Sequence, residues 1–561
     1  MFEMRRVVQK WGLFLGVSVL AAAVVFSSRS ALASDFVEMG NAAGLSFGRN
    51  AVNGYLEIRK EGQPVEVDID NRLNFYLQGA FEFRGSPYIL VYNTAENVPS
   101  GRRLSRGTEG SDLYAVSIKD GAAVFDKVAT LPVGIDVRLQ VSRQDDSALA
   151  CLTTVCVLLR TDTKAAVTQS IIKLPAGQEL VELAGSRLLL QKVFNDQADD
   201  FPPADVPIFS TCSLQNDSIA CVDVPATVIP YDLKEDGSYS VVRGFEDVLH
   251  FDYERLGLAN YSEPNLEGRI TWSNVYFLTG LADLYVIGAS EGFRASIRDR
   301  LVQEFEAIAR LQETVYPGLK VRRYSIDREP INFLLHFSRL AKAVERARPA
   351  IGDALADRIL ARLLGEIREP TSTIEQLVKD AGGHAELEYR RYVPFWADGV
   401  NVPWNFQSAW IEALSLTGIP DELMQSAASM LETFAREEKL SARPRKWSYA
   451  GGAFHEGWSD GRSFNTPKWA GQKQTAAPAH ISYRSMDALA VLAAKKAGID
   501  AVPDFESYAS ELIVEGFLYP FVNEGLAQPV RIPFGIARHY ARSYLPWQFQ
   551  NQVWALESLS R

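Results

Sequence analysis

The sequence predicts a chain of two structural halves, an antiparallel all-β region followed by an all-α region. One observation is a change of hydrophobic period near residue 257, where alternating apolar residues give way to helical runs. A second is that aromatic, amide and basic side chains precede an apolar helical run five times in the second half. A third is that nine of the ten tryptophans lie between Trp272 and Trp554, and none lies in the predicted β region.

The N-terminus has the three parts of a secretory signal. A basic segment, residues 1–12, precedes an apolar stretch from Leu13 to Phe26, and Ala31-Leu32-Ala33 forms a small-x-small cleavage site. We therefore expect residues 1–33 to be a signal peptide and the protein to be periplasmic or secreted. The alternative is an uncleaved N-terminal membrane anchor, which would be the protein's contact with a membrane.

Residues 34–256 are expected to form the β region. Short apolar or alternating runs such as SRLLLQKV lie between turn signals, among them Asp120-Gly121 and Asp236-Gly237, which are typical of tight hairpins. Strand pairs recur roughly every 45 to 55 residues, a spacing that fits irregular propeller blades and also a sandwich. The sequence therefore predicts a propeller-like domain or a sandwich.

The cysteines predict two local disulfides. Cys151 and Cys156 are equidistant from Thr153-Thr154, and Cys212 and Cys221 are equidistant from residues 216–217, an Asn-Asp pair suited to a two-residue turn. The two cysteines of each pair would face each other across a hairpin. An exported chain also folds in an oxidising compartment, where such pairs form disulfides. The alternative is four buried thiols.

Residues 257–561 are expected to be all-α, because helical runs alternate with the five aromatic and basic openings. A helical hairpin cannot bury its own apolar face, so repeated hairpins stack on one another, here around a ring. The starts of the inner helices would then line one rim. The five openings begin at Arg269, Val321, Tyr389, Ala479 and Arg538.

Charge and short motifs exclude several classes of function. A net charge of -11 argues against a general nucleic-acid binder, which needs a basic excess. The sequence has no Gly-rich phosphate loop, dinucleotide fingerprint or zinc-ligand spacing, so we predict neither a cofactor nor a metal. Gly457-Trp458-Ser459-Asp460-Gly461 matches the G-x-S-x-G pattern, but loop-like sequence flanks it where a nucleophile elbow needs a strand and a helix.

Two loops carry the candidate site, one over residues 389–405 and a long Gly-rich one over residues 447–473. A loop of that length in a compact domain is typically functional or disordered, and its many aromatic residues favour a folded loop over a site. Aromatic rings stack on sugar CH faces, and planar amide and guanidinium groups bind hydroxyls and carboxylates. The predicted substrate-binding residues are Arg390, Arg391, Trp396, Trp404, Asn405, Trp458, Tyr483, Arg484 and Trp547.

The predicted chemistry is proton transfer next to a sugar carboxylate. In a uronate lyase or C5 epimerase, Tyr or His acts as acid and base while Arg and Asn neutralise the carboxylate, and Tyr449 and His455 are the candidates. A glycoside hydrolase is the alternative, because such enzymes use two carboxylates. Its candidates are the loop residues Asp398, Glu456 and Asp460.

A secreted β domain followed by a ring of helical hairpins resembles the α/α-toroid carbohydrate-active enzymes: glucoamylase-like hydrolases, toroid polysaccharide lyases and glucuronyl C5 epimerases. The resemblance covers residues 257–561 and implies an α/α-toroid with a polysaccharide or oligosaccharide as partner. The predicted function is therefore processing of an acidic polysaccharide. An alternative function, which involves no catalysis, is that of a periplasmic protein that binds or assembles an exopolysaccharide. Its β region would then dock a protein partner.

Overall fold

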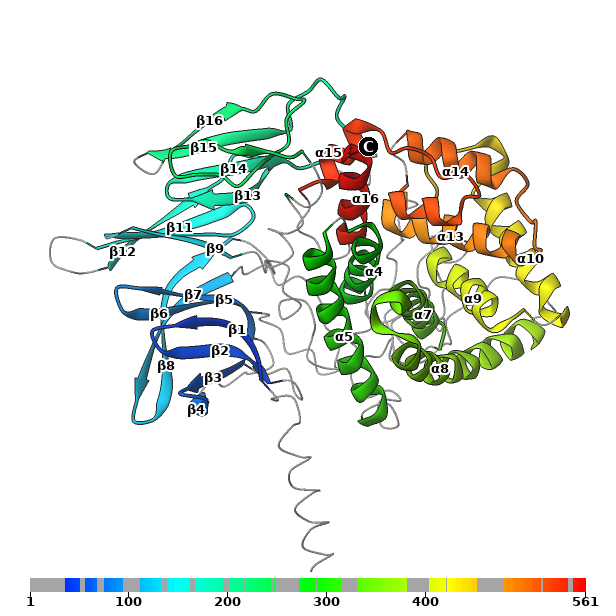
Figure 1. Ribbon diagram of the computed structural model, residues 1–561, viewed down its shortest axis with the longest axis horizontal. Coiled ribbons are helices and arrows are strands. Elements are labelled where there is room, and N and C mark those ends of the chain that lie inside the picture. The colour runs from blue at the N-terminus through cyan, green and yellow to red at the C-terminus, as the bar shows by residue number, and fades with distance from the viewer. Residues whose placement is uncertain are drawn as a thin grey trace, which may run out of the picture.

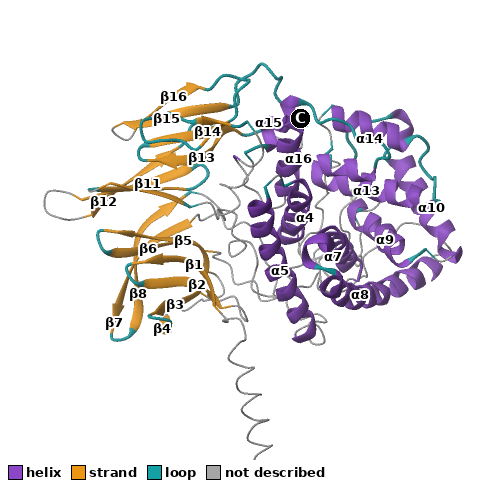
Figure 2. Ribbon diagram, viewed as in Figure 1, coloured by secondary structure: helices purple, strands orange, loops and turns teal. Residues whose placement is uncertain are grey.

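The computed structural model of the chain shows an all-β region followed by a helical region, as the sequence predicts (Figures 1 and 2). The strands end at Val241 and α4 begins at Trp272, so the predicted domain boundary at residue 256 lies outside the described residues. The structure describes residues 36–50, 56–67, 75–93, 111–132, 139–144, 146–161, 167–194, 201–215, 218–243, 247, 272–288, 290–314, 330–380, 403–419, 421–451, 478–515, 518–542 and 548–560.

The β region is built from meanders of four antiparallel strands stacked face to face (Figure 1). The first two meanders join through a short parallel pairing of β4 with β8, which gives one eight-stranded sheet. The strands are β1 (Phe36–Ala42), β2 (Leu45–Asn50), β3 (Leu56–Lys60), β4 (Gln63–Val67), β5 (Phe75–Phe83), β6 (Ser86–Asn93), β7 (Ser111–Lys119), β8 (Ala122–Leu131), β9 (Gln140–Gln144), β10 (Ser147–Cys151), β11 (Val155–Thr161), β12 (Val167–Lys173), β13 (Gln178–Ala184), β14 (Arg187–Lys192), β15 (Phe209–Gln215), β16 (Ser218–Asp223), β17 (Pro230–Tyr231) and β18 (Ser240–Val241).

The eight-stranded sheet curls until its two ends almost meet, so that it resembles a barrel. A Cβ added to Gly40 in β1 would lie 3.2 Å from the Cβ of Ala80 in β5. Phe47, Ile58 and Leu77 are buried in the core that the curl encloses. Sheet β9–β12 stacks on the outside of β5–β8, and sheet β13–β16 stacks on β9–β12. The sequence analysis predicted either a propeller-like domain or a sandwich. Sheets packed face to face, as observed here, occur in both architectures.

Of the two predicted tight hairpins, the one at Asp120-Gly121 is present, whereas Asp236-Gly237 lies within the longer connection, residues 232–239, between β17 and β18. Asp120 and Gly121 have φ of 50° and 83°, and the ladder closes from Lys119 to Ala122 on either side of them. Positive φ at both central residues gives the twist of a two-residue hairpin, which aspartate and glycine tolerate better than other residues. The prediction of a hairpin at Asp120-Gly121 is confirmed.

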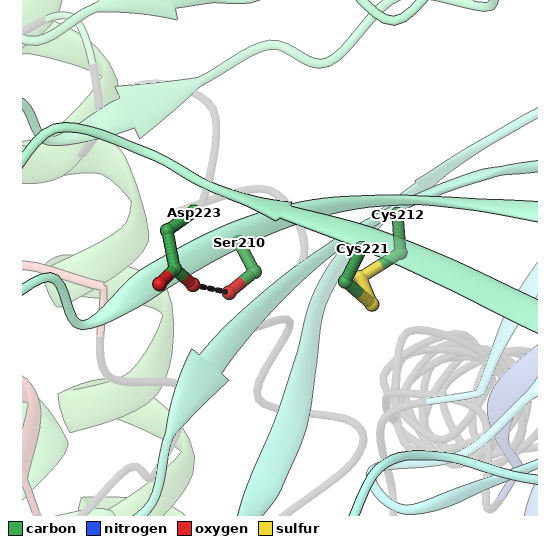
Figure 3. The surroundings of a disulfide bond; sticks show 4 residues. All are labelled: Ser210, Cys212, Cys221 and Asp223. Atoms are coloured by element: carbon green, nitrogen blue, oxygen red, sulfur yellow. Dashed lines mark hydrogen bonds between the residues drawn. A yellow bond between two sulfur atoms is a disulfide. The ribbon is translucent and has the colours of Figure 1, made fainter.

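Both predicted disulfides are confirmed. Cys151 pairs with Cys156 across the β10–β11 hairpin, and Cys212 pairs with Cys221 across the β15–β16 hairpin. Figure 3 shows the second bridge beside the hydrogen bond that the Ser210 hydroxyl donates to the Asp223 carboxylate over 2.8 Å. Disulfides persist in oxidising compartments, so the pairing indicates such a compartment for this protein.

The helical region has an inner ring of helices with further helices outside it (Figure 2). Helix α4 packs on α7, α7 on α9 and α9 on α13, and the 3-10 helix η5 connects α13 to α16, which packs back on α4. Because α16 packs back on α4, the helix contacts form a closed circuit. This circuit is compatible with the predicted α/α-toroid, which stays a prediction. The elements are α4 (Trp272–Ile287), α5 (Glu291–Thr314), α7 (Pro330–Ile351), α8 (Asp353–Asp380), α9 (Trp404–Thr417), α10 (Asp421–Glu437), η4 (Leu440–Ala442), α13 (Ile481–Lys496), α14 (Phe505–Val514), η5 (Pro520–Gly525), α15 (Phe534–Tyr540) and α16 (Phe549–Ser560).

The β13–β16 sheet and the helical region share one hydrophobic core. Two arginines, Arg538 and Arg542, hold the two regions together. Arg538 in α15 donates to the carbonyl oxygens of Val206 at 2.7 Å and Ala226 at 3.0 Å. Arg542 forms a buried ion pair with Glu182 of β13. The fifth sequence opening therefore contributes its arginines to the junction of the two regions.

No helix among the described residues combines the length and the apolar character required to cross a bilayer. The predicted signal peptide, residues 1–33, lies outside the described residues.

Candidate functional site

A belt of polar side chains runs around the inside of the helical ring. Each inner helix carries polar residues three, four or seven positions apart, so that they share one face of that helix. On α9 these are Asn405, Ser408 and Glu412, and on α7 they are Arg339, Lys342 and Arg346. The other members are Tyr276 and Asp283 on α4, Tyr483 and Asp487 on α13, Gln550 and Trp554 on α16, and Glu524 on η5. We call this set the polar belt.

Hydrogen bonds and ion pairs connect the belt from one helix to the next. Glu412 of α9 pairs through Oε1 with Arg339 at 3.3 Å and Lys342 at 3.2 Å, both on α7. Arg346 of α7 pairs with Asp283 of α4, which also accepts hydrogen bonds from Gln550 at 2.8 Å and Trp554 at 3.1 Å, both on α16.

The belt reaches the surface on the side of α7 and η5. The side chains of Lys342, Arg346 and Glu524 are 31%, 39% and 28% exposed, and Arg346 lies 3.5 Å from Glu524. Burial raises the pKa of Asp283 to about 6, although the Arg346 guanidinium opposes that rise. A buried charge network adds less stability than a well-packed apolar core of the same volume, which makes the belt a candidate functional surface.

The described end of the first predicted site loop meets the base of the second loop beside the belt. The backbone N–H of Trp404, at the end of the first loop, donates to the carbonyl of Tyr449 in the second loop over 3.0 Å. The second loop is closed at its base, because Ala479 N–H donates to the Trp447 carbonyl over 2.8 Å and Ser448 bridges to Pro478. The described end of the first loop thus lies beside the base of the second loop.

Trp404 and Arg484 hold these loop bases in position. Trp404 is 2% exposed, packs against Phe434 at 5.3 Å between ring centroids, and donates its indole N–H to Glu438 over 2.9 Å. Arg484 is fully buried and donates to the carbonyls of Ala479 and Arg445, each at 2.9 Å. These contacts support structural roles for both, and their predicted contact with a sugar stays a prediction.

Tyr449 and Tyr483 form the aromatic part of the site, with ring centroids 5.2 Å apart. Their hydroxyls lie in a low-dielectric environment, and burial raises the pKa of each phenol. A raised phenol pKa keeps the hydroxyl protonated at neutral pH. Burial therefore makes Tyr449 a weaker acid, and its protonated hydroxyl can donate a hydrogen bond but cannot act as a base at neutral pH.

Asp487 is a carboxyl that the sequence interpretation missed. It is buried on α13, where it accepts hydrogen bonds from the Trp447 indole at 2.9 Å and the Ser408 hydroxyl at 3.0 Å. Burial raises its pKa to about 8, and these two hydrogen bonds offset only part of that rise. Asp487 thus ties the second loop to α9 and α13 through a group that titrates near neutral pH.

Asp283, Glu412 and Asp487 share a sequence signal that could have identified them. Each is a lone acidic residue in an otherwise apolar helical run: TGLADLYVI, AWIEALSL and SMDALAVLA. Acidic residues are rarely fully buried unless they are paired, so an acid within an apolar run indicates a specific partner.

Two asparagines on opposite sides of the ring have unpaired amides. Asn405, the second residue of α9, and Asn551, the third of α16, are 1% and 0% exposed. Neither the amide nitrogen nor the amide oxygen of either residue makes a hydrogen bond. Buried polar groups in folded proteins are nearly always paired, so these amides are candidates for contact with a ligand or ordered water.

The remaining predicted site residues lie outside the described residues: Arg390, Arg391, Trp396, Asp398, His455, Glu456, Trp458, Asp460 and Trp547. Within the described part of the chain, no group of three His, Cys, Asp or Glu side chains could hold a metal ion. That observation does not test the predicted absence of a metal and of a cofactor, which both stay predictions.

No family model matches this chain, and no curated protein matches it either. The resemblance to α/α-toroid carbohydrate-active enzymes therefore stays a hypothesis about architecture.

Proposed function

We propose that the helical region binds an acidic polysaccharide or oligosaccharide where the 389–405 and 447–473 loops meet, and processes it as a uronate lyase or C5 epimerase. The unpaired amide of Asn405, at the base of both loops, is the observation that carries this proposal. Leaving a buried amide unpaired costs about 1–3 kcal/mol. A sugar offers neighbouring hydroxyls that donate to and accept from a planar amide, so its binding would remove that cost.

The described residues support a division of roles in proton transfer. Tyr449 is the candidate general acid, and because burial raises the pKa of its phenol, it would protonate only a strongly basic acceptor such as the carbanion left by removal of the C5 proton. The base would be His455 of the same loop, because an imidazole ordinarily titrates near neutral pH.

Binding without turnover is the second candidate. It is favoured by the burial of Tyr449, which raises the pKa of the candidate acid and makes it a weaker proton donor. In that case the protein would guide or assemble an exopolysaccharide, and its β region would dock a protein partner.

One experiment separates the candidates. The full chain is incubated with a panel of acidic polysaccharides in D₂O. A lyase produces the ultraviolet absorbance of an unsaturated uronate, and an epimerase introduces deuterium at C5 that NMR detects. Binding with neither signal supports the scaffold, and the absence of binding and turnover across the panel contradicts the proposal.

Two variants test the residues. Asn405→Leu should weaken glycan binding about tenfold, because a site built on hydrogen bonds loses affinity when a partner is removed. Tyr449→Phe should slow turnover by roughly a hundredfold to ten-thousandfold and leave binding nearly intact. Ser415→Ala, at the far end of α9, is the matched control. If Asn405→Leu binds and turns over every glycan as the parent does, the site is structural.

We further propose that the chain is exported and cleaved after Ala33, so that the mature protein is periplasmic or secreted. The two disulfides support an oxidising compartment, and the N-terminal sequence pattern supports cleavage. N-terminal sequencing of protein from the native host should begin near Ser34. An intact N-terminus on protein from the membrane fraction would show an anchor instead.

A further inference from the structure

Strand β16 is an open edge of the β region. It is the outermost strand of the β13–β16 sheet, and among the described strands it pairs with β15 alone (Figure 1). All of its residues except Ile219 are exposed, and Val222, at 72%, is the most exposed large hydrophobic residue in the described part of the chain. The outer side of such a strand has backbone N–H and C=O groups that a further strand can pair with.

Strand β16 lacks the features that usually protect an edge strand from pairing. Its sequence, SIACVD, contains no lysine, arginine or proline, and its six residues pair with β15 without a bulge. By contrast, β12, which is the edge of the neighbouring sheet, ends in Lys173. The Cys212–Cys221 disulfide also ties β16 to β15, so that the edge is already extended before a partner binds.

The pairing with β15 determines which residues of β16 direct their backbone groups outward. The N–H of Val224, just beyond β16, donates to the carbonyl of Phe209 over 2.9 Å, so the residues at even positions bond to β15. The Cα atoms of Cys212 and Cys221 are 4.0 Å apart, which is typical of an opposed pair that exchanges no hydrogen bond. Residues at odd positions of β16 therefore direct N–H and C=O away from β15. These residues are Ile219, Cys221 and Asp223.

We propose that two copies of this chain associate by antiparallel pairing of their β16 strands, with a two-fold axis at Cys221. Opposed residues of an antiparallel pair exchange hydrogen bonds only if both direct their backbone groups toward each other. With the axis at Cys221, Ile219 of one copy faces Asp223 of the other, and Cys221 faces Cys221. All three outward residues are then paired. An axis at Ala220 or Val222 would leave one of the three without a partner in the opposite β16.

The side chains of β16 suit this pairing. Val222 of each copy would lie opposite Ala220 of the other, which places a large exposed apolar side chain against a small one. Ile219, which would face Asp223, already packs against the core between the two stacked sheets. Asp223 is the only charged residue of β16, and the two copies of it would lie about 14 Å apart along the pair, where salt largely screens exposed charges. No like charges are therefore opposed.

Sedimentation velocity of the purified protein, from low to high micromolar concentration, tests this dimer. Stable interfaces between folded proteins use roughly 20–30 residues from each partner, whereas β16 has six, so the dimer should be reversible. The parent should pass from monomer to dimer as its concentration rises. A monomer at every concentration overturns the proposal and leaves the edge to a strand of another protein.

Single variants assign the association to β16. Val222→Lys should weaken dimerisation on the order of tenfold or more, because the two ammonium groups would lie diagonally across the pair on one face. The variant should keep its fold, which circular dichroism checks, since Val222 is exposed and the disulfide still holds the strand. Val514→Lys, at a 50% exposed position of α14, is the matched control and should dimerise as the parent does.

A double variant tests the register. Ala220→Glu alone should also weaken the dimer, because it places two carboxylates diagonally across the pair. Combined with Val222→Lys in one chain, it places a carboxylate opposite an ammonium on each side of the axis and should restore most of the lost affinity. If neither single variant weakens the dimer, or if the double variant recovers nothing, the inference is wrong. It does not depend on the proposed glycan site, so Asn405→Leu should leave dimerisation unchanged.

Discussion

Replacing Asp487 by asparagine should shift the pH dependence of stability in a defined direction. Burial raises the pKa of the Asp487 carboxyl to about 8 in the folded chain, whereas the model-compound value of 3.8 applies in the unfolded chain. Between these values the folded state holds a proton that the unfolded state has lost. The contribution of Asp487 to the free energy of unfolding therefore falls as pH rises from about 4 to about 8, and it is lost above pH 8.

The size of the effect follows from proton linkage. One proton bound in the folded state and absent from the unfolded state changes the free energy of unfolding by about 1.4 kcal/mol per pH unit. Asparagine cannot titrate, and its amide oxygen can still accept a hydrogen bond from Trp447 or Ser408. From pH 5 to pH 7, the difference in stability should thus move in favour of Asp487→Asn by on the order of 3 kcal/mol.

Urea denaturation of the parent and of Asp487→Asn at several pH values measures this difference. Asp500→Asn, at an exposed position beyond the end of α13, is the control for losing one carboxylate. A stability difference between Asp487→Asn and the parent that does not change with pH would refute the reasoning. It would mean that Asp487 is ionised in the folded protein at neutral pH.

Three further changes should alter stability by amounts that urea denaturation can measure. Trp404→Ala should lower the free energy of unfolding by about 3–5 kcal/mol, because it leaves a cavity against Phe434, and a loss under about 1 kcal/mol would contradict the observed packing. Arg542→Met should cost about 3–5 kcal/mol by leaving the buried Glu182 without a counter-ion, with only its hydrogen bonds from two backbone N–H groups, and Arg542→Lys should cost less, so equal losses would count against the ion pair. Cys151→Ser should cost only about 2 kcal/mol, since that disulfide closes a very short loop, and failure to fold would contradict this estimate.

Local pattern was sufficient for the fold class and the disulfides. Alternation of period two and the change to a helical period near residue 257 depend only on neighbours in the chain, and the structure has strands to Val241 and α-helices from Trp272. The pairing of Cys212 with Cys221 depends on the symmetry of a single hairpin, which is also local. The stacking order of the sheets could not be predicted, because it depends on which faces meet over long distances in the chain.

The candidate site shows the limit of reasoning from composition. Trp404 and Arg484 have residue types that suit a sugar site, yet packing against Phe434 and hydrogen bonds to backbone carbonyls give them structural contacts. Conversely, the sequence interpretation did not select Asp487, although a lone acid in an apolar helical run indicates a specific partner. Its raised pKa comes from burial, which only the packed structure creates.

The sequence by itself determined the order of the two regions and both disulfides. These follow from hydrophobic period and turn chemistry, which are properties of short segments. The tertiary structure alone decided that Asp283 meets Arg346, that Glu412 meets Arg339, and that Asn405 lacks a partner. Such contacts join helices far apart in the chain, and their energies depend on desolvation and distance, which are set when the ring closes.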